Sequence, residues 1–287
     1  PVENPMTMVR RFQSGGLDLV YVVPPERVDW AKRELGTQMR VGRGVSNEVL
    51  VFNTRRGPTA DVRVRRALSM AIDRETIARS VIAFPGVDAW GYVPPGIGNW
   101  GEGAKPDFAA WTQARRDAEA RRLLAAAGYG AARPLKMRIS FPSTELNRKV
   151  AVAIATMWRR VGVLPELQQK ETKSLVAEVA RGDFDAARFV WLAGFSDPVA
   201  FLERLYSSGS AVGVNASGYA NPKYDALLER AQQEVDLARR AAILREAEAL
   251  ALADQPVAPV YYLVGRRLVS SRTTGFAENP RGMYPSW

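Results

Sequence analysis

Cysteine and histidine are both absent from this chain of 287 residues. Without cysteine the chain has no disulfide, no thiolate zinc site and no cysteine nucleophile. Without histidine it has no Ser-His-Asp triad, no histidine metal ligand and no histidine general base. Many common enzyme mechanisms are therefore excluded, and we expect no catalytic residue, no metal and no cofactor.

Long apolar runs are absent as well. No run approaches the roughly 18 uninterrupted apolar residues that a membrane-spanning helix requires. Residues 1–10, PVENPMTMVR, lack an initiator methionine and the apolar core of a signal peptide. We therefore expect the numbered chain to be a processed product, a cloned segment or a fragment.

The net charge of +10 comes from 40 Lys and Arg against 30 Asp and Glu. The arginines are mixed with acids along helical stretches, as in RRDAEARR at 115–122. This pattern is typical of solvated helix faces with i,i+4 ion pairs. No stretch combines clustered basic residues with interleaved aromatics, so nucleic acid is not an expected partner.

The middle of the chain alternates between the period of a strand and that of a helix. Such a β-α-β-α-β run predicts an α/β protein with a helix-covered sheet. The strands are expected at 135–141, 163–169 and 184–193, with helices at 145–161 and 172–181. Further strands are expected at 17–23, at two short pieces within 39–53, and at 257–264. Residues 84–107, rich in Gly and Pro, predict a long loop.

Two features of the sequence resemble chemical motifs. GIGNWG at 96–101 matches a dinucleotide-binding pattern formally, but Pro94 and Pro95 precede it where that motif requires a strand. Carboxylates that could act as acid and base lie at the expected ends of elements, and nothing in the sequence selects two as partners. They are Asp183, Asp185, Asp197 and Asp225. A carboxylate-dependent hydrolase of peptides or sugars therefore stays an alternative.

Residues 184–202, FDAARFVWLAGFSDPVAFL, are the most informative stretch. An apolar strand carries Arg188 and Trp191, turns after Leu192, and enters a helix through Asp197. Strand ends that present a charge and an aromatic beside a turn commonly bind ligands in α/β proteins. A core strand followed by a capped helix fits the same residues, and Arg188 would then require an internal acidic partner.

Several segments resemble one family in their order and spacing. VFNTRRGPTADVRVRRALSMAIDRETI at 51–77 resembles a segment of the oligopeptide-binding proteins of bacterial ABC transporters, which belong to extracellular solute-binding protein family 5. The resemblance covers essentially the whole chain. It continues through YVPPG (92–96), ARRLLAAAGYG (120–130), the 184–202 stretch, GYANPKYDALL (218–228) and PVYYLVGRRLV (259–269).

The resemblance implies a periplasmic-binding-protein-like (type II) two-lobed α/β fold, present here as one complete lobe plus a fragment of the other. Residues 1–52 would be a partial segment of lobe I, 53–263 the ligand-binding lobe, and 264–287 a return to lobe I. Family members are longer, so the chain resembles their C-terminal part, with the signal peptide absent. In the family the lobes close on a peptide by hinge motion, and strand edges pair with the peptide backbone.

The resemblance also implies a set of ligand-binding residues. The family strand reads Arg-x-Gly-Trp-Cys-Ala-Asp, and its Asp, which binds the peptide α-amino group, is replaced here by Gly194. Asn147 stands where the family has His, and Leu263 where it has Tyr. These changes favour modified or blocked peptides, opines or another small solute. The implied residues are Asn147, Arg188, Val190, Trp191, Leu192, Gly194, Phe195 and Leu263.

The expected function is therefore that of a solute-binding component of an ABC importer. It would capture a peptide or peptide-like solute in the periplasm and deliver it to the permease subunits in the membrane, without catalysis or a cofactor. Besides a hydrolase, a degenerate lobe that acts as a protein-interaction module stays an alternative.

Overall fold

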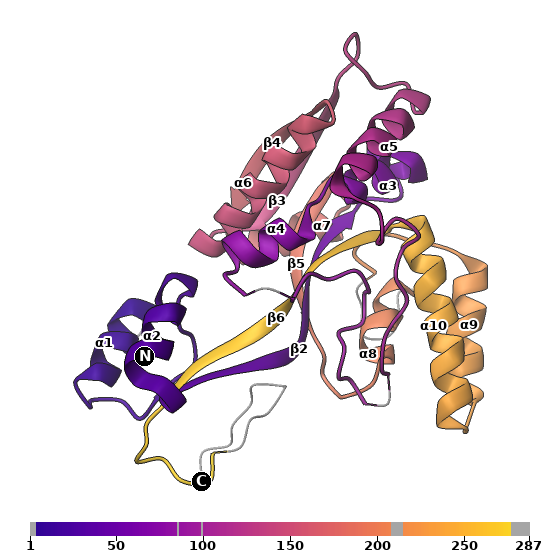
Figure 1. Ribbon diagram of the computed structural model, residues 1–287. Coiled ribbons are helices and arrows are strands. Elements are labelled where there is room, and N and C mark those ends of the chain that lie inside the picture. The colour runs from indigo at the N-terminus through magenta and orange to yellow at the C-terminus, as the bar shows by residue number, and fades with distance from the viewer. Residues whose placement is uncertain (1–3, 85, 99, 208–214, 277–287) are drawn as a thin grey trace.

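The computed structural model describes residues 4–84, 86–98, 100–207 and 215–276 (Figure 1). The shape is elongated. Helices α1 (Pro5–Gln13) and α2 (Val28–Leu35) form a small unit at one end. Two long strands, β2 (Met39–Phe52) and β6 (Val257–Val269), join it to the larger, helix-covered part of the molecule.

Within the described residues, six strands form one sheet in the order β1-β6-β2-β5-β3-β4. Strands β3, β4 and β5 are parallel, whereas β2 is antiparallel to both β5 and β6. The remaining strand bounds are β1 (Leu19–Val20), β3 (Leu135–Pro142), β4 (Val163–Lys170) and β5 (Ala186–Leu192). The predicted β-α-β-α-β run is confirmed, with α6 (Glu145–Arg160) and α7 (Thr172–Ala180) as its helices.

The other helices begin at polar caps, as their sequences indicate. Asp61, Asp73, Thr112, Asn221 and Asp236 each accept a hydrogen bond from a backbone N–H in the following first turn. The helices they start are α3 (Val62–Met70), α4 (Arg74–Thr76), α5 (Gln113–Ala126), α9 (Pro222–Gln233) and α10 (Leu237–Asp254). The short α8 (Val199–Leu202) follows β5.

Each face of the sheet covers its own hydrophobic core. One core joins β2, β3 and β5 to α3, α5 and α6. The core on the opposite face joins the same sheet to α7, α8, α9 and α10 and includes the loop residues Tyr92 and Trp100. A third, smaller core lies under α1 and α2. Because side chains alternate along a strand, β5 contributes to both large cores.

The prediction of two short strands within 39–53 is wrong. The structure has one strand of 14 residues there, which pairs with β6 on both sides of a register shift between Arg43 and Asn47. The irregularity leaves residues 44–46 without a partner in β6 but does not end the strand, so Gly42 and Gly44 lie within one strand. The strand expected to end at Val264 likewise continues to Val269.

The limits proposed for the domains stay a prediction. Strand β6 runs without interruption through residue 263, and β2 ends at Phe52 beside β5 of the larger part. The two proposed regions therefore share one continuous sheet. Residues 277–287 of the predicted return segment lie outside the described residues.

Residues 86–107 contain no helix or strand among their described positions, and a buried carboxylate holds this loop in place. Glu248 of α10 accepts hydrogen bonds from the backbone N–H groups of Tyr92 (2.7 Å), Val93 (2.8 Å) and Ala104 (2.6 Å). Burial raises the pKa of Glu248 to about 7, although these N–H groups lower it in part. The loop is thus tied to α10 at a group that titrates near neutral pH.

This pKa predicts a pH dependence of stability. Because the folded pKa lies above the unfolded value, the contribution of Glu248 is complete below about pH 4.5 and is lost as pH rises to about 7. Between these pH values the free energy of unfolding of the wild type should fall by up to about 3 kcal/mol more than that of Glu248→Gln. Urea unfolding between pH 4.5 and 8 measures it, with the exposed Glu246→Gln as the matched control. Parallel curves for the wild type and Glu248→Gln would contradict the prediction.

Candidate functional site

The end of β5 has one unpaired edge among the described residues. Its pairing with β3 covers only Ala186 and Ala187, whereas its pairing with β2 continues to Leu192. Figure 1 shows β5 continuing from this point toward α8. Open α/β sheets bind ligands beyond the carboxyl ends of their strands, and the carboxyl ends of parallel β3, β4 and β5 meet here. Residues 188–192 therefore form the centre of the candidate site.

A buried ion pair lies at the start of this edge. Arg188 Nη2 is 2.7 Å from Glu48 Oε1 on β2, and both side chains are almost fully buried. Arg188 Nη1 also donates to the main-chain oxygen of Asn147 in the first turn of α6. Burial raises the pKa of Glu48, while the Arg188 charge lowers it in part. Arg188 therefore has the internal acidic partner that one of the two interpretations of the sequence required. A role of Arg188 in ligand binding stays a prediction.

The ion pair also reaches β6. Tyr261 lies opposite Glu48 in the β2–β6 register, and the charges of both Glu48 and Arg188 act on its hydroxyl group. Burial raises the pKa of the Tyr261 hydroxyl above its usual range. Three adjacent strands and α6 thus meet at one polar cluster inside the sheet. Removing either charge would leave the other uncompensated in a medium of low polarity.

Apolar side chains flank the unpaired edge. Val190, Leu192 and Phe195 are 48%, 52% and 48% exposed, which is unusual for large apolar side chains that lie so close together. Gly194 follows them, and a Cβ atom at this position would meet nothing within 4 Å. The edge therefore combines free backbone groups, an apolar rim and open space at its end.

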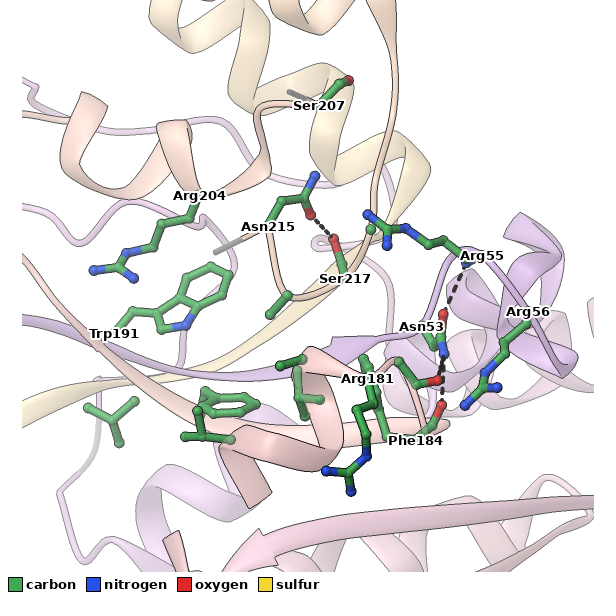
Figure 2. A pocket seen from close by; sticks show the side chains of 18 residues that line it. Asn53, Arg55, Arg56, Arg181, Phe184, Trp191, Arg204, Ser207, Asn215 and Ser217 are labelled. Carbon is green, nitrogen blue, oxygen red and sulfur yellow. Dashed lines mark hydrogen bonds between the residues drawn. The ribbon is translucent and has the colours of Figure 1, made fainter. Parts of the chain in front are cut away.

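Trp191 faces the opposite side of β5 from Arg188. It is buried in the second core, with its ring 4.7 Å from that of Tyr92 in an edge-to-face arrangement. The guanidinium of Arg204 lies 5.7 Å from the Trp191 ring centre. Trp191 also lines an open pocket of about 740 Å³ beside α7 (Figure 2).

The other predicted residues divide between two places. Asn147 joins the site, since its carbonyl accepts from Arg188 and its N–H donates to Thr144 Oγ1 over 3.2 Å. Leu263 is partly buried in β6 and lines a separate hollow with Tyr21 and Ser46 near the register shift in β2. The structure thus joins Asn147 to the strand residues and places Leu263 apart from them.

Sequence reasoning missed Glu48 and the four arginines that line the pocket beside α7, which are Arg55, Arg56, Arg181 and Arg204. Glu48 directly precedes the apolar run at 49–52 in a strand buried on both faces, and an acid at such a position indicates a buried basic partner. The unpaired edge had no sequence signal, because it depends on where β3 diverges from β5. In the part of the chain that the structure describes, no group of three or more Asp and Glu forms a metal site. No helix of that part is long and apolar enough to cross a membrane.

The family model and the curated relatives that match this chain all point to the same protein family. The family model "Bacterial extracellular solute-binding proteins, family 5 Middle" matches residues 1–213. The periplasmic oligopeptide-binding protein OppA of Escherichia coli is 32% identical over 281 residues, covering 96% of this chain and 50% of OppA. The periplasmic murein peptide-binding protein MppA of the same organism is 31% identical over 280 residues, covering 97% of this chain and 51% of MppA.

Solved structures give the same result. Haemophilus influenzae OppA in complex with RPPGFSPFR superposes with a TM-score of 0.87 at 30% identity, over 98% of this chain and 55% of that one. Burkholderia pseudomallei OppA gives a TM-score of 0.88 at 32% identity, with the same coverage. The chain therefore has the fold of the corresponding half of these proteins, and it spans about half the length of the curated relatives it matches.

The ion pair gives a stability prediction. Arg188→Met should lower the free energy of unfolding by about 3–5 kcal/mol, because Glu48 stays buried without a partner. The double variant Arg188→Met/Glu48→Leu should lose clearly less. Urea denaturation measures both, and Arg79→Met, which breaks an exposed i,i+4 pair with Glu75, should change stability by less than about 0.5 kcal/mol. If the double variant is as unstable as Arg188→Met, the instability does not come from an uncompensated Glu48, and the prediction is contradicted.

Proposed function

The chain belongs to the bacterial extracellular solute-binding proteins of family 5, and we propose that it supplies one side of the ligand cleft of a peptide importer. The observation that carries the proposal is the unpaired edge of β5 at residues 188–192. An extended peptide can add to such an edge as a strand, with main-chain hydrogen bonds giving affinity and flanking pockets giving specificity. The half-exposed Val190 and Leu192 provide apolar contacts for alternate side chains.

The proposed ligand is peptide-like rather than an ordinary peptide with a free amine. Gly194 supplies no carboxylate where the resembled proteins bind the α-ammonium group of a peptide. An ammonium enclosed without a partner is costly, so a blocked or modified amino end suits this site better. Arg188 is available to a ligand carboxylate only if it leaves Glu48, so we assign it the role of positioning β5 beside β2.

The four carboxylates considered for the hydrolase alternative are all engaged in contacts within the described part of the chain. Asp183 and Asp185 pair with Arg138, and Asp197 pairs with Arg240 at 2.7 Å. Asp225 accepts from the Ser207 N–H and is the remaining member of the predicted set. Carboxylates held in this way are poorly placed to act as a general acid and base pair. A solute-binding protein located in the periplasm, with ABC permease subunits as its partners, is the function that fits best.

Gly194→Asp tests the ligand class. In a protein that joins this chain to a complete lobe I, the substitution should raise affinity for trialanine about tenfold to a hundredfold, the equivalent of about 1.5–3 kcal/mol for a charge-assisted hydrogen bond. N-acetyl-trialanine should gain nothing. Calorimetry measures the affinity for both peptides. The control variant is Gly130→Asp, which adds the same charge at another exposed position with space for a side chain. Tight binding of trialanine by the unsubstituted protein, with no gain from Asp, would show that the amine is held elsewhere.

A second test concerns the need for both lobes. One lobe offers half a cleft, and hinged binding proteins gain affinity by enclosing the ligand. N-acetyl-trialanine at a fixed concentration should raise the melting temperature of the two-lobed protein and leave that of the 287-residue chain unchanged. An equal shift in the two proteins would mean that β5 binds the peptide without lobe I.

A further inference from the structure

Glu248 is a buried carboxylate whose partners in the described part of the chain are all hydrogen-bond donors. Its Oε1 atom accepts from the N–H groups of Tyr92 and Val93, and its Oε2 atom accepts from that of Ala104. The carboxylate thus joins both ends of the segment 92–104 to α10. An ionised carboxylate only accepts, whereas a carboxylic acid carries a hydrogen that needs an acceptor of its own. The arrangement therefore fits the charged form of Glu248.

The loop lies directly against this carboxylate. A Cβ atom at Gly103 would lie 2.6 Å from Glu248 Oε2 and 2.8 Å from Trp100 Nε1. A Cβ atom at Gly91 would lie 3.2 Å from Glu248 Oε1. Glycine at these two positions lets the backbone approach closely enough for its neighbours to donate to the carboxylate. Because the contact is this close, a change at the carboxylate has to move the loop.

Tyr92 connects the loop to the candidate site by two contacts. Its ring packs edge to face against that of Trp191, with the ring centres 4.7 Å apart. Its main-chain oxygen accepts a hydrogen bond from Asn47 Nδ2, and Asn47 is the residue opposite Trp191 in the β2–β5 register. The N–H group of the same tyrosine donates to Glu248. Tyr92 thus lies between the carboxylate on α10 and the tryptophan on β5, in contact with both.

Glu248 also changes charge near neutral pH. Burial raises its pKa to about 7, and the charge of Arg245 on the same helix lowers this pKa in part. Among the described residues, the other titratable groups that interact with it are the hydroxyls of Tyr92, Tyr224 and Tyr262, from the loop, α9 and β6. Burial raises the pKa of each of these hydroxyls, so they stay neutral in this range. The chain has no histidine or cysteine, the side chains that most often titrate near pH 7.

We propose that Glu248 is a positioning residue for the candidate site, whose charged form holds Tyr92 against Trp191 and whose protonated form releases both. Protonation places a hydrogen on an oxygen that donors already surround, so the contacts of that oxygen with the loop are weakened. Because burial favours the neutral acid, this release does not unfold the chain. The inference rests on the proposed function in one respect, namely that Trp191 lies where the ligand binds. Ligand binding thereby depends on pH without a contact between Glu248 and the ligand.

The position of Trp191 can be followed without a ligand. The 287-residue chain is labelled with 5-fluorotryptophan, and the fluorine resonance of residue 191 is assigned with Trp191→Phe. In the wild type this resonance should move between about pH 5.5 and 8.5 with a midpoint at about 7, because Glu248 changes charge there. In Glu248→Gln, which carries no charge at any pH, it should stay in one position. The resonance of Trp158, which lies in the opposite core and donates to the Leu68 carbonyl, should not move in either protein.

Two further variants separate this link from other causes. Glu246→Gln removes an exposed carboxylate two positions earlier on α10 and should keep the wild-type titration. Tyr92→Leu keeps the backbone N–H group but removes the ring contact, so it should reduce the movement of the Trp191 resonance by at least about half. Tyr92→Leu also decides the proposal if Glu248→Gln does not fold, as judged by thermal melting.

Three results would overturn the link. The first is a Trp191 resonance that does not move with pH in the wild type. The second is a resonance that moves equally in Glu248→Gln, because another buried acid such as Glu48 would then be the titrating group. The third is an unchanged titration in Tyr92→Leu, because the signal would then reach Trp191 by another route.

A second measurement connects the link to ligand binding. In the two-lobed protein described above, the Kd of N-acetyl-trialanine should be about twofold to tenfold higher at about pH 5.5 than at about pH 8.5, as expected for the loss of one aromatic contact. Glu248→Gln should give the same Kd at both pH values. Binding by the wild type that is independent of pH would overturn the positioning role. If the two-lobed protein does not bind this peptide at either pH, the proposed function fails, and the fluorine resonance of Trp191 still decides its link to Glu248.

Discussion

The buried pair of Arg188 and Glu48 is the constraint on which the candidate site depends. Neither charge is tolerated alone inside the sheet, so β5 and β2 have to remain side by side where the pair lies. Strand β5 has lost its other neighbour, β3, at this point. The ion pair, with Asn147 and Tyr261 around it, therefore holds a strand that is paired on one side only. A free edge that stays straight and fixed is what strand addition by a ligand requires.

Local sequence patterns predicted much of the fold and failed where distant segments pair. The alternation of strand and helix between residues 135 and 193, and the caps at Asp61 and Asn221, depend on near neighbours and could be read directly. Strand β2 could not, because Gly42 and Gly44 resemble a break. Its continuity comes from the long antiparallel ladder with β6, more than 200 positions later in the chain. A single sequence does not display a contact of that kind.

The candidate site could be predicted only in part, again because some of its residues meet through contacts between distant segments. Arg188 and Trp191 stand out because a charge and a tryptophan interrupt an apolar strand. They are three positions apart, so strand periodicity places them on opposite faces, and the structure puts one with Glu48 and the other in the second core. Glu48 and Arg55 come from segments far from β5 in the sequence. Only the folded chain brings their charges to this strand.

The two surfaces of β5 are close enough to serve one ligand. Phe189, Val190 and Trp191 all line the open pocket beside α7, although consecutive side chains point to opposite faces of a strand. A pocket that touches three consecutive residues has to reach the strand's edge, and this edge is the one that lacks β3 as a partner. A peptide-like ligand paired with residues 188–192 would thus pass the mouth of the pocket. A side chain of such a ligand would enter it there and add selectivity to main-chain pairing that is otherwise indifferent to sequence.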